Sequence, residues 1–139
     1  MKKLLFLFTA PLLISCSSED DVNENQSFLD KYDEYGFTDG DEYWFFFNDT
    51  VFLRYAEPAE FTCFEIKEGE NRTFIAEIIS NDSQKLLVEL TSPCSDCGTE
   101  SLQFTIDSTG NNLTVMYDGD SNDTDSYMKT STKFNSVCE

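Results

Sequence analysis

Histidine is absent from the 139-residue chain. Its absence removes the Ser-His-Asp and Cys-His arrangements of nucleophilic enzymes, the commonest general base, and most catalytic metal sites. The chain also has no glycine-rich phosphate loop and no nucleophile elbow. Carboxylates are so frequent, at 27 Asp and Glu, that no pair stands out as catalytic. We therefore expect a protein that is not an enzyme and needs no cofactor.

Basic side chains are scarce as well. Nine Lys and Arg stand against the 27 acids, which gives a net charge of −18. A charge of this sign repels nucleic acid and anionic lipid, and it favours solubility, cationic partners or divalent ions. Nucleic acid is therefore excluded from the expected partners.

The long apolar run at the N-terminus, residues 4–14, is too short to cross a bilayer, which takes about 20 residues. It follows two lysines and precedes Ser15 and Cys16, a pattern typical of an export signal. Leu13-Ile14-Ser15-Cys16 resembles the lipobox of bacterial lipoproteins, which implies cleavage before Cys16 and lipidation of this residue. An ordinary signal peptide with a chance cysteine is the alternative.

The segment after the lipobox is polar and acidic. Its sequence, residues 17–26, predicts an unstructured tether. The stretch 17–21 resembles the acidic export tag of some Gram-negative lipoproteins, which implies an outer-membrane lipoprotein exposed at the cell surface; a plain solvated linker is the alternative. We thus divide the chain into a signal peptide (1–15), a lipidated Cys with its tether (16–26) and one domain (27–139). Removing residues 1–15 removes two Lys and no acid, so the net charge becomes −20.

Four cysteines remain in the exported part: Cys63, Cys94, Cys97 and Cys138. An even number in an oxidising compartment predicts two disulfides, and three pairings are possible. We favour Cys63–Cys138, which would pin the C-terminal tail to a strand, together with a tight Cys94–Cys97 bridge.

Two other functions of these cysteines are weighed. A redox C-x-x-C needs a basic environment to lower the thiol pKa, whereas Cys94 and Cys97 have Asp96 and Glu100 nearby and no Lys or Arg. A zinc site made by all four cysteines is a weak pattern, and export favours oxidation.

The domain begins with a predicted helix at 26–35, with Ser27 as N-cap and Gly36 as its end. Alternating apolar residues separated by turn residues then predict eight strands, at 42–48, 50–56, 61–67, 73–80, 84–92, 100–107, 112–118 and 125–131. The connections are short, so neighbouring strands should be antiparallel.

Three predicted strands alternate cleanly, with the apolar rows Phe74, Ala76, Ile78; Leu102, Phe104, Ile106; and Leu113, Val115, Tyr117. The first strand differs because Tyr43 to Phe47 is aromatic on both faces. We expect its outer face to be covered by the N-terminal helix through Phe28 and Tyr32, or else by a partner.

Eight short antiparallel strands predict an all-β fold, either a two-sheet sandwich or, as we favour, an up-and-down barrel with a short N-terminal helix. Residues 28–32 are similar to the helix that opens the domain in lipocalin-like outer-membrane lipoproteins, and residues 110–117 are similar to that family's penultimate strand. The resemblance implies a lipocalin-like eight-stranded barrel and carries little information about activity.

The acidic loop after residue 117 is a weak calcium candidate. Asp118, Asp120 and Asn122 match the first three ligand positions of a calcium loop. The match then fails, with Asp123 in place of the turn glycine and Lys129 in place of the bidentate Glu. We favour a solvated hairpin turn.

The aromatic residues suggest either a ligand cavity or a filled core, and the filled core is favoured. Candidates for a cavity lining are Tyr43, Phe45, Phe47, Phe52, Arg54, Phe64 and Phe104. The expected function is a surface-tethered binding module for a small hydrophobic ligand or an outer-membrane partner. The alternative is a structural or interaction protein that acts through its acidic surface or its aromatic patch.

Overall fold

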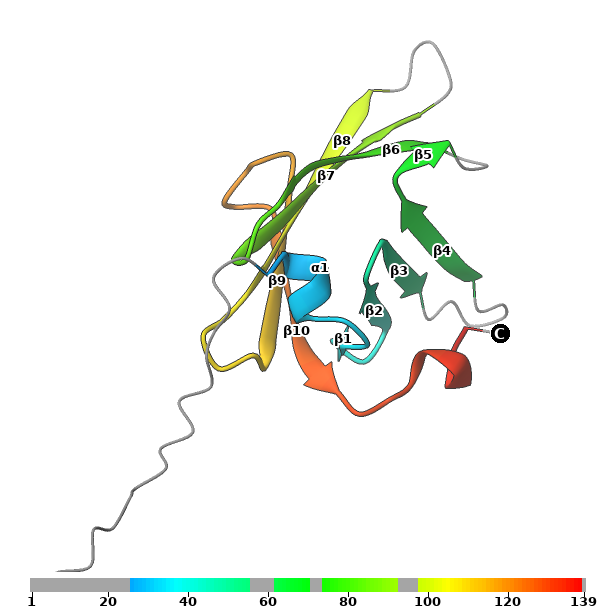
Figure 1. Ribbon diagram of the computed structural model, residues 1–139, viewed down its shortest axis with the longest axis vertical. Helices are drawn as coiled ribbons and strands as arrows, with labels where there is room; N and C mark the ends of the chain where they lie inside the picture. Colours follow the sequence, from blue (N-terminus) through cyan, green and yellow to red (C-terminus); the bar gives the residue numbers. More distant parts are fainter. Residues whose placement is uncertain (1–25, 56–61, 71–73, 93–97, 139) are drawn as a thin grey trace, which may run out of the picture.

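The structure is a computed structural model that describes residues 26–55, 62–70, 74–92 and 98–138 (Figure 1). The predicted signal peptide, Cys16, nearly all of the tether, and the Cys94–Cys97 pair lie outside these residues.

The predicted all-β class is confirmed. The described residues form ten strands and one short α-helix, α1 (Phe28–Lys31). The strands are β1 (Gly36–Thr38), β2 (Glu42–Phe47), β3 (Thr50–Tyr55), β4 (Thr62–Lys67), β5 (Gly69–Glu70), β6 (Ile75–Asn81), β7 (Lys85–Thr91), β8 (Thr99–Ile106), β9 (Asn112–Tyr117) and β10 (Thr124–Thr130).

The predicted number of eight strands is wrong. The two additional strands, β1 and β5, are three and two residues long, too short to show the alternation on which the prediction depended. The other eight agree with the predicted ranges to within about two residues at each end, the usual scatter of strand boundaries.

All ten strands belong to one antiparallel sheet, in the order β4-β3-β2-β1-β10-β9-β8-β7-β6-β5. The sheet curls so far that β4 comes to lie against β6, and it is nearly closed into a barrel (Figure 1). The terminal strands β4 and β5 are joined through Glu68 alone, so the opening lies beside this corner.

The hydrophobic core fills the inside of the barrel. Phe104 is fully buried, and its ring centroid lies 5.0 Å from that of Trp44 and 5.6 Å from that of Phe46. The three predicted apolar rows, at 74–78, 102–106 and 113–117, belong to this core or pack against it. Edge-to-face aromatic contacts of this kind add about 0.5–1.5 kcal/mol each to the burial of their area.

Helix α1 covers one end of the barrel, which we call the closed end; the opposite end is the mouth (Figure 1). The Phe28 ring packs 5.4 Å from Phe46, and the Leu29 backbone N–H donates to Asn81 Oδ1 at 3.1 Å. The expectation that this helix covers the outer face of β2 is therefore wrong, because Phe46 faces inward.

The helix is also shorter than predicted. The predicted N-cap is confirmed, since Ser27 Oγ accepts a hydrogen bond from the Asp30 N–H at 3.2 Å. The end at Gly36 is wrong: the helix stops at Lys31, Glu34 takes a positive φ of 63°, and Gly36 already pairs in β1.

The Phe45 ring lies so close to the backbone of residue 36 that this position requires glycine. A Cβ atom on this residue would lie 2.8 Å from the Phe45 ring, and Phe134 packs on that ring with centroids 5.6 Å apart. Because the ring would have to shift from its contact with Phe134, we expect Gly36→Ala to lower the free energy of unfolding by about 1–3 kcal/mol.

The matched control is Gly98→Ala, where a Cβ meets nothing within 4 Å. Urea unfolding of both variants measures the difference. Equal midpoints for the two would contradict the tight packing of Phe45 on β1.

Candidate functional site

The strand register separates the seven predicted cavity residues. Trp44 pairs with Leu53 on the inner face, so the neighbouring pairs Tyr43–Arg54 and Phe45–Phe52 face outward. The outward residues are Tyr43, Phe45, Phe47, Phe52 and Arg54, and the inward ones are Phe64 and Phe104. These seven residues therefore do not line one cavity.

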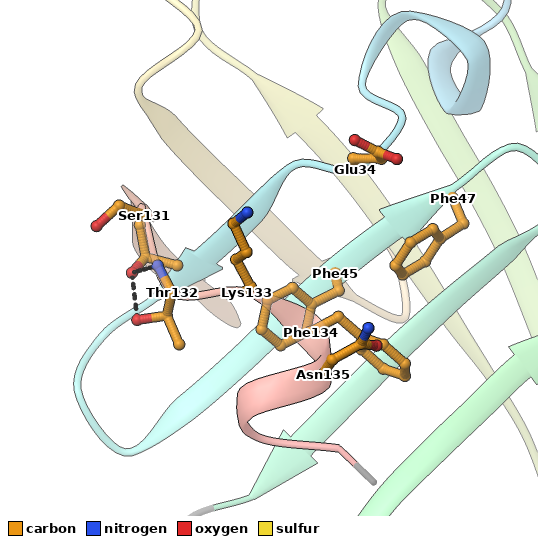
Figure 2. A pocket seen from close by; sticks show the side chains of 9 residues that line it. Glu34, Phe45, Phe47, Ser131, Thr132, Lys133, Phe134 and Asn135 are labelled. Carbon is orange, nitrogen blue, oxygen red and sulfur yellow. Dashed lines mark hydrogen bonds between the residues drawn. The ribbon is translucent and has the colours of Figure 1, made fainter.

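The outward phenylalanines are covered by the C-terminal segment. Its 3-10 helix η1 (Phe134–Ser136) places the Phe134 ring 5.6, 5.2 and 4.6 Å from the rings of Phe45, Phe47 and Phe52 (Figure 2). We call these four residues the outer aromatic cluster. A groove of about 390 Å³ runs along this contact.

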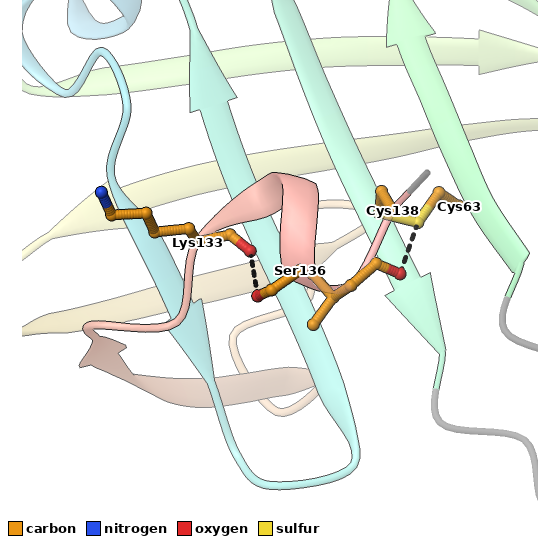
Figure 3. Close-up of a disulfide and its surroundings, with 5 residues drawn as sticks. Cys63, Lys133, Ser136 and Cys138 are labelled. Atoms are coloured by element: carbon orange, nitrogen blue, oxygen red, sulfur yellow. Dashed lines mark hydrogen bonds between the residues drawn. A yellow bond between two sulfur atoms is a disulfide. The ribbon is translucent and has the colours of Figure 1, made fainter.

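A disulfide fixes the end of this segment. Cys138 bonds to Cys63 of β4, with their Cα atoms 5.8 Å apart, which confirms the predicted pairing (Figure 3). In the register, Cys63 is opposite Arg54, whose guanidinium lies over the Tyr43 ring at 5.4 Å. Arg54 is thus nearly buried on the outside of the barrel.

The inner site is a hollow of about 260 Å³ between β2–β4 and β7–β9, away from α1. Its lining residues are Trp44, Leu53, Phe64, Ile66, Phe74, Leu90, Glu100, Leu102 and Tyr117. Phe104 lies deeper, two positions beyond Leu102 on the same face of β8, with its ring against Trp44.

Further polar residues lie toward the mouth, next to Trp44 of the hollow. The Tyr127 hydroxyl donates to Glu42 Oε2 at 2.8 Å. The buried Trp44 indole N–H makes no hydrogen bond of ordinary geometry among the described residues, although it approaches the Tyr127 hydroxyl.

Burial raises the pKa of Glu42 above its usual 4.5, and Asp39, Asp125 and Asp41 raise it further, against the opposing effect of the Tyr127 hydrogen bond. Burial, with smaller contributions from Asp125 and Glu42, raises the pKa of Tyr117 to about 12. The mouth is therefore a region of negative potential next to an apolar hollow.

The calcium candidates lie in the turn between β9 and β10. Asp118 Oδ1 accepts the Ser101 N–H at 2.8 Å, and Asp120 Oδ1 accepts the Asn122 N–H and side-chain amide, both at 2.9 Å. In the part of the chain that the structure describes, Asp, Glu and Cys form no group of three that could hold a metal ion. Asp118 thus links this turn to β8, and Asp120 holds the turn itself.

Comparisons of this chain with known protein families, with curated proteins and with solved structures find no match. Within the described ranges, no helix is long and apolar enough to cross a membrane.

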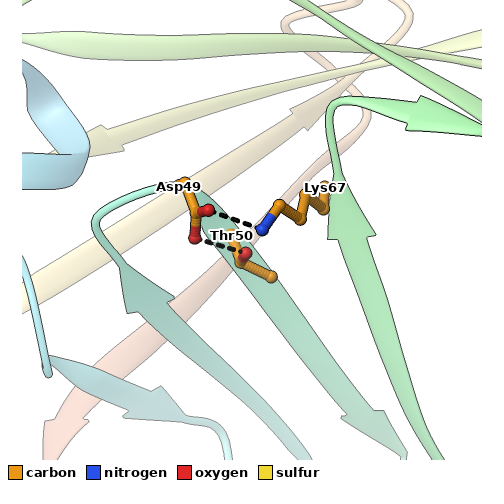
Figure 4. Close-up of polar contacts among 3 residues, drawn as sticks. All are labelled: Asp49, Thr50 and Lys67. Carbon is orange, nitrogen blue, oxygen red and sulfur yellow. Dashed lines mark hydrogen bonds and ion pairs between the residues drawn. The ribbon is translucent and has the colours of Figure 1, made fainter.

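Other acids stabilise turns. Asp49 pairs with Lys67 at 2.6 Å and accepts the Thr50 hydroxyl at 2.8 Å (Figure 4). Asp82 accepts the Gln84 and Lys85 N–H groups at 2.9 and 2.8 Å, and Asp107 accepts the Asn112 amide at 2.6 Å. These hydrogen bonds hold the pKa of Asp49, Asp82, Asp107 and Asp120 below the usual 3.8.

The aspartates with a lowered pKa and Glu42 with its raised pKa together predict a stability maximum at mildly acidic pH. A lowered pKa in the folded state stabilises the protein above about pH 4, and this contribution is lost as the pH falls through the folded-state value. The raised pKa of Glu42 has the opposite effect on stability. The buried carboxylate destabilises the folded state while it is ionised, and this destabilisation is relieved as the pH falls. Protonation also reduces the repulsion among the acids.

We expect the urea midpoint, followed by Trp44 fluorescence, to be highest near about pH 5, lower near pH 8 and lowest near pH 3. Asp82→Asn and Asp107→Asn should flatten the acid side alone. A midpoint that still rises toward pH 3 would contradict the assignment of these aspartates to turn stabilisation.

Proposed function

We propose that this protein is a non-catalytic binding module, anchored through lipid on Cys16 to the outer membrane of a bacterium and exposed at the cell surface. Its barrel holds a small, largely apolar ligand. The anchor is supported by the lipobox-like sequence 13–16 and the acidic segment after it. The absence of histidine from the chain supports a role without catalysis.

The hollow is the observation that carries the binding proposal. One end of the barrel is filled by Phe28 and Phe46 under α1, whereas the mouth end retains about 260 Å³ among aromatic and aliphatic side chains. Sites for drug-sized ligands usually enclose about 300–1,000 Å³, so the ligand should be small.

The alternative is a structural or interaction protein that docks on an outer-membrane partner. Its acidic surface suits that role. The outer aromatic cluster suits it less, because Phe134 and the Cys63–Cys138 bridge already cover it.

Native mass spectrometry tests the proposal. The protein is expressed from the full sequence, so that residues 1–15 direct its export and the lipidation of Cys16, and it is purified in digitonin. We expect extra mass that leaves on denaturation. The variant Leu90→Trp fills the hollow and should lose this mass. The control Ile79→Trp, at a position 45 % exposed on β6, should keep it. A wild-type chain that takes up no ligand, even from a lipid extract, would overturn the proposal.

A further inference from the structure

The walls of the hollow are rich in aromatic rings. Trp44, Phe64, Phe74 and Tyr117 line it together with aliphatic side chains. The faces of such rings carry partial negative charge, and they attract organic cations as well as apolar groups. Aromatic walls therefore suit a ligand with an apolar body, and they tolerate a positive charge better than a negative one.

The mouth of the barrel carries carboxylates on three separate strands. Glu100 of β8 lines the hollow itself, opposite Leu90. Glu42 of β2 holds the buried Tyr127 hydroxyl. Asp125 of β10 pairs with the inward residue Val115, and its charge contributes to the raised pKa of the Tyr117 hydroxyl. Three inward positions at the mouth are thus carboxylates.

The described cations lie elsewhere. Four lysines lie at the closed end. Lys31 is in α1, and Lys85 follows the β6–β7 turn. Lys67 is opposite Thr50 beside the β2–β3 turn, and Lys129 is opposite Phe37. The other two, Arg54 and Lys133, lie outside the barrel, over Tyr43 and in the outer groove.

Among the described residues, the inward positions at the mouth are therefore acidic, and no basic side chain lines the hollow. A cleft lined by one sign of charge concentrates ligands of the opposite sign.

We propose that the ligand of the hollow is an organic cation: a small molecule whose apolar body lies on the aromatic walls and whose amine or quaternary ammonium head lies at the rim beside Glu100. This inference rests on the binding function proposed above and specifies its ligand class. Fatty acids and other anions should bind more weakly, because their carboxylate would approach Glu100 and the other acids at the mouth.

Three probes of equal chain length test the charge: hexylammonium, hexanol and hexanoate. Trp44 is the one tryptophan of the sequence and lines the hollow, so its fluorescence reports binding there. With the full chain in digitonin, we expect hexylammonium to bind about tenfold more tightly than hexanol, and hexanoate to bind more weakly than both. About half-molar salt should reduce this preference severalfold.

Glu100→Gln removes one carboxylate at an exposed position and should reduce the preference for hexylammonium about threefold or more. Its control is Glu89→Gln on the outer face of β7, opposite Glu77, which should leave the preference unchanged. Equal affinities for hexylammonium and hexanol would overturn the cation inference and leave the binding function standing. Binding of none of the three probes would overturn both.

Discussion

Replacing Cys63 and Cys138 together by serine is expected to lower the free energy of unfolding by about 4–5 kcal/mol. The bridge joins residues separated by 75 positions. A covalent link over a loop of this length removes a large amount of conformational entropy from the unfolded chain, which in the loop-closure estimate corresponds to that free energy. Urea unfolding of the oxidised full chain, followed by Trp44 fluorescence, measures the loss.

The same variant should release the C-terminal segment from the outer face of β2–β4. Phe45, Phe47 and Phe52 would then be exposed whenever Phe134 leaves them, and binding of a hydrophobic dye should increase. Ser136→Ala is the control in the same segment: its hydroxyl donates to Lys133 O at the exposed surface, so its loss should change stability by less than about 0.5 kcal/mol (Figure 3).

A double-serine variant within about 1 kcal/mol of the wild type would mean that Phe134 alone holds the segment.

The strands were predictable because their signal is local. In β8 from Leu102 onward and in β9, every second residue is apolar, and turn residues such as Ser108-Thr109-Gly110 interrupt the pattern. β1 and β5 give no such signal, because they are only three and two residues long; β1 pairs with β2 and with the distant β10, and β5 pairs with β6.

The candidate site was harder to predict because β2 is aromatic at five successive positions. Where both faces are aromatic, alternation cannot tell which residues point inward. The register with β3 decides it, by placing Trp44 opposite Leu53. For this reason the sequence singled out Phe45 and Phe47 for the cavity and missed Trp44, Phe74 and Leu90. The clean alternation of β9 did contain a signal for Tyr117.

The cover of the outer face was not predictable from local pattern either. Phe134 is an isolated aromatic residue in a polar tail, without periodicity. Only the predicted Cys63–Cys138 bridge indicated that this tail returns to the sheet, and it did so without showing that the outer aromatic cluster lies beneath it.

Phe104→Ala is expected to cost about 3–5 kcal/mol of stability, because the ring is fully buried between Trp44 and Phe46 and the barrel wall around it cannot collapse into the space. Phe104→Leu keeps most of the volume and should cost clearly less. Met128→Ala, at a position 69 % exposed on β10, should be nearly neutral. Urea unfolding of the three variants under one set of conditions gives the comparison.

Phe104→Ala also tests where the hollow ends. Phe104 lies directly beyond Leu102 and against Trp44, both of which line the hollow, so removing its ring should extend the hollow toward the closed end. The ratio of octylammonium affinity to hexylammonium affinity should then be higher for Phe104→Ala than for the wild type, even though the folded state of the variant is less stable. If the chain-length preference is unchanged while stability falls by the expected amount, the new space is separate from the hollow, and Trp44 rather than Phe104 forms its floor.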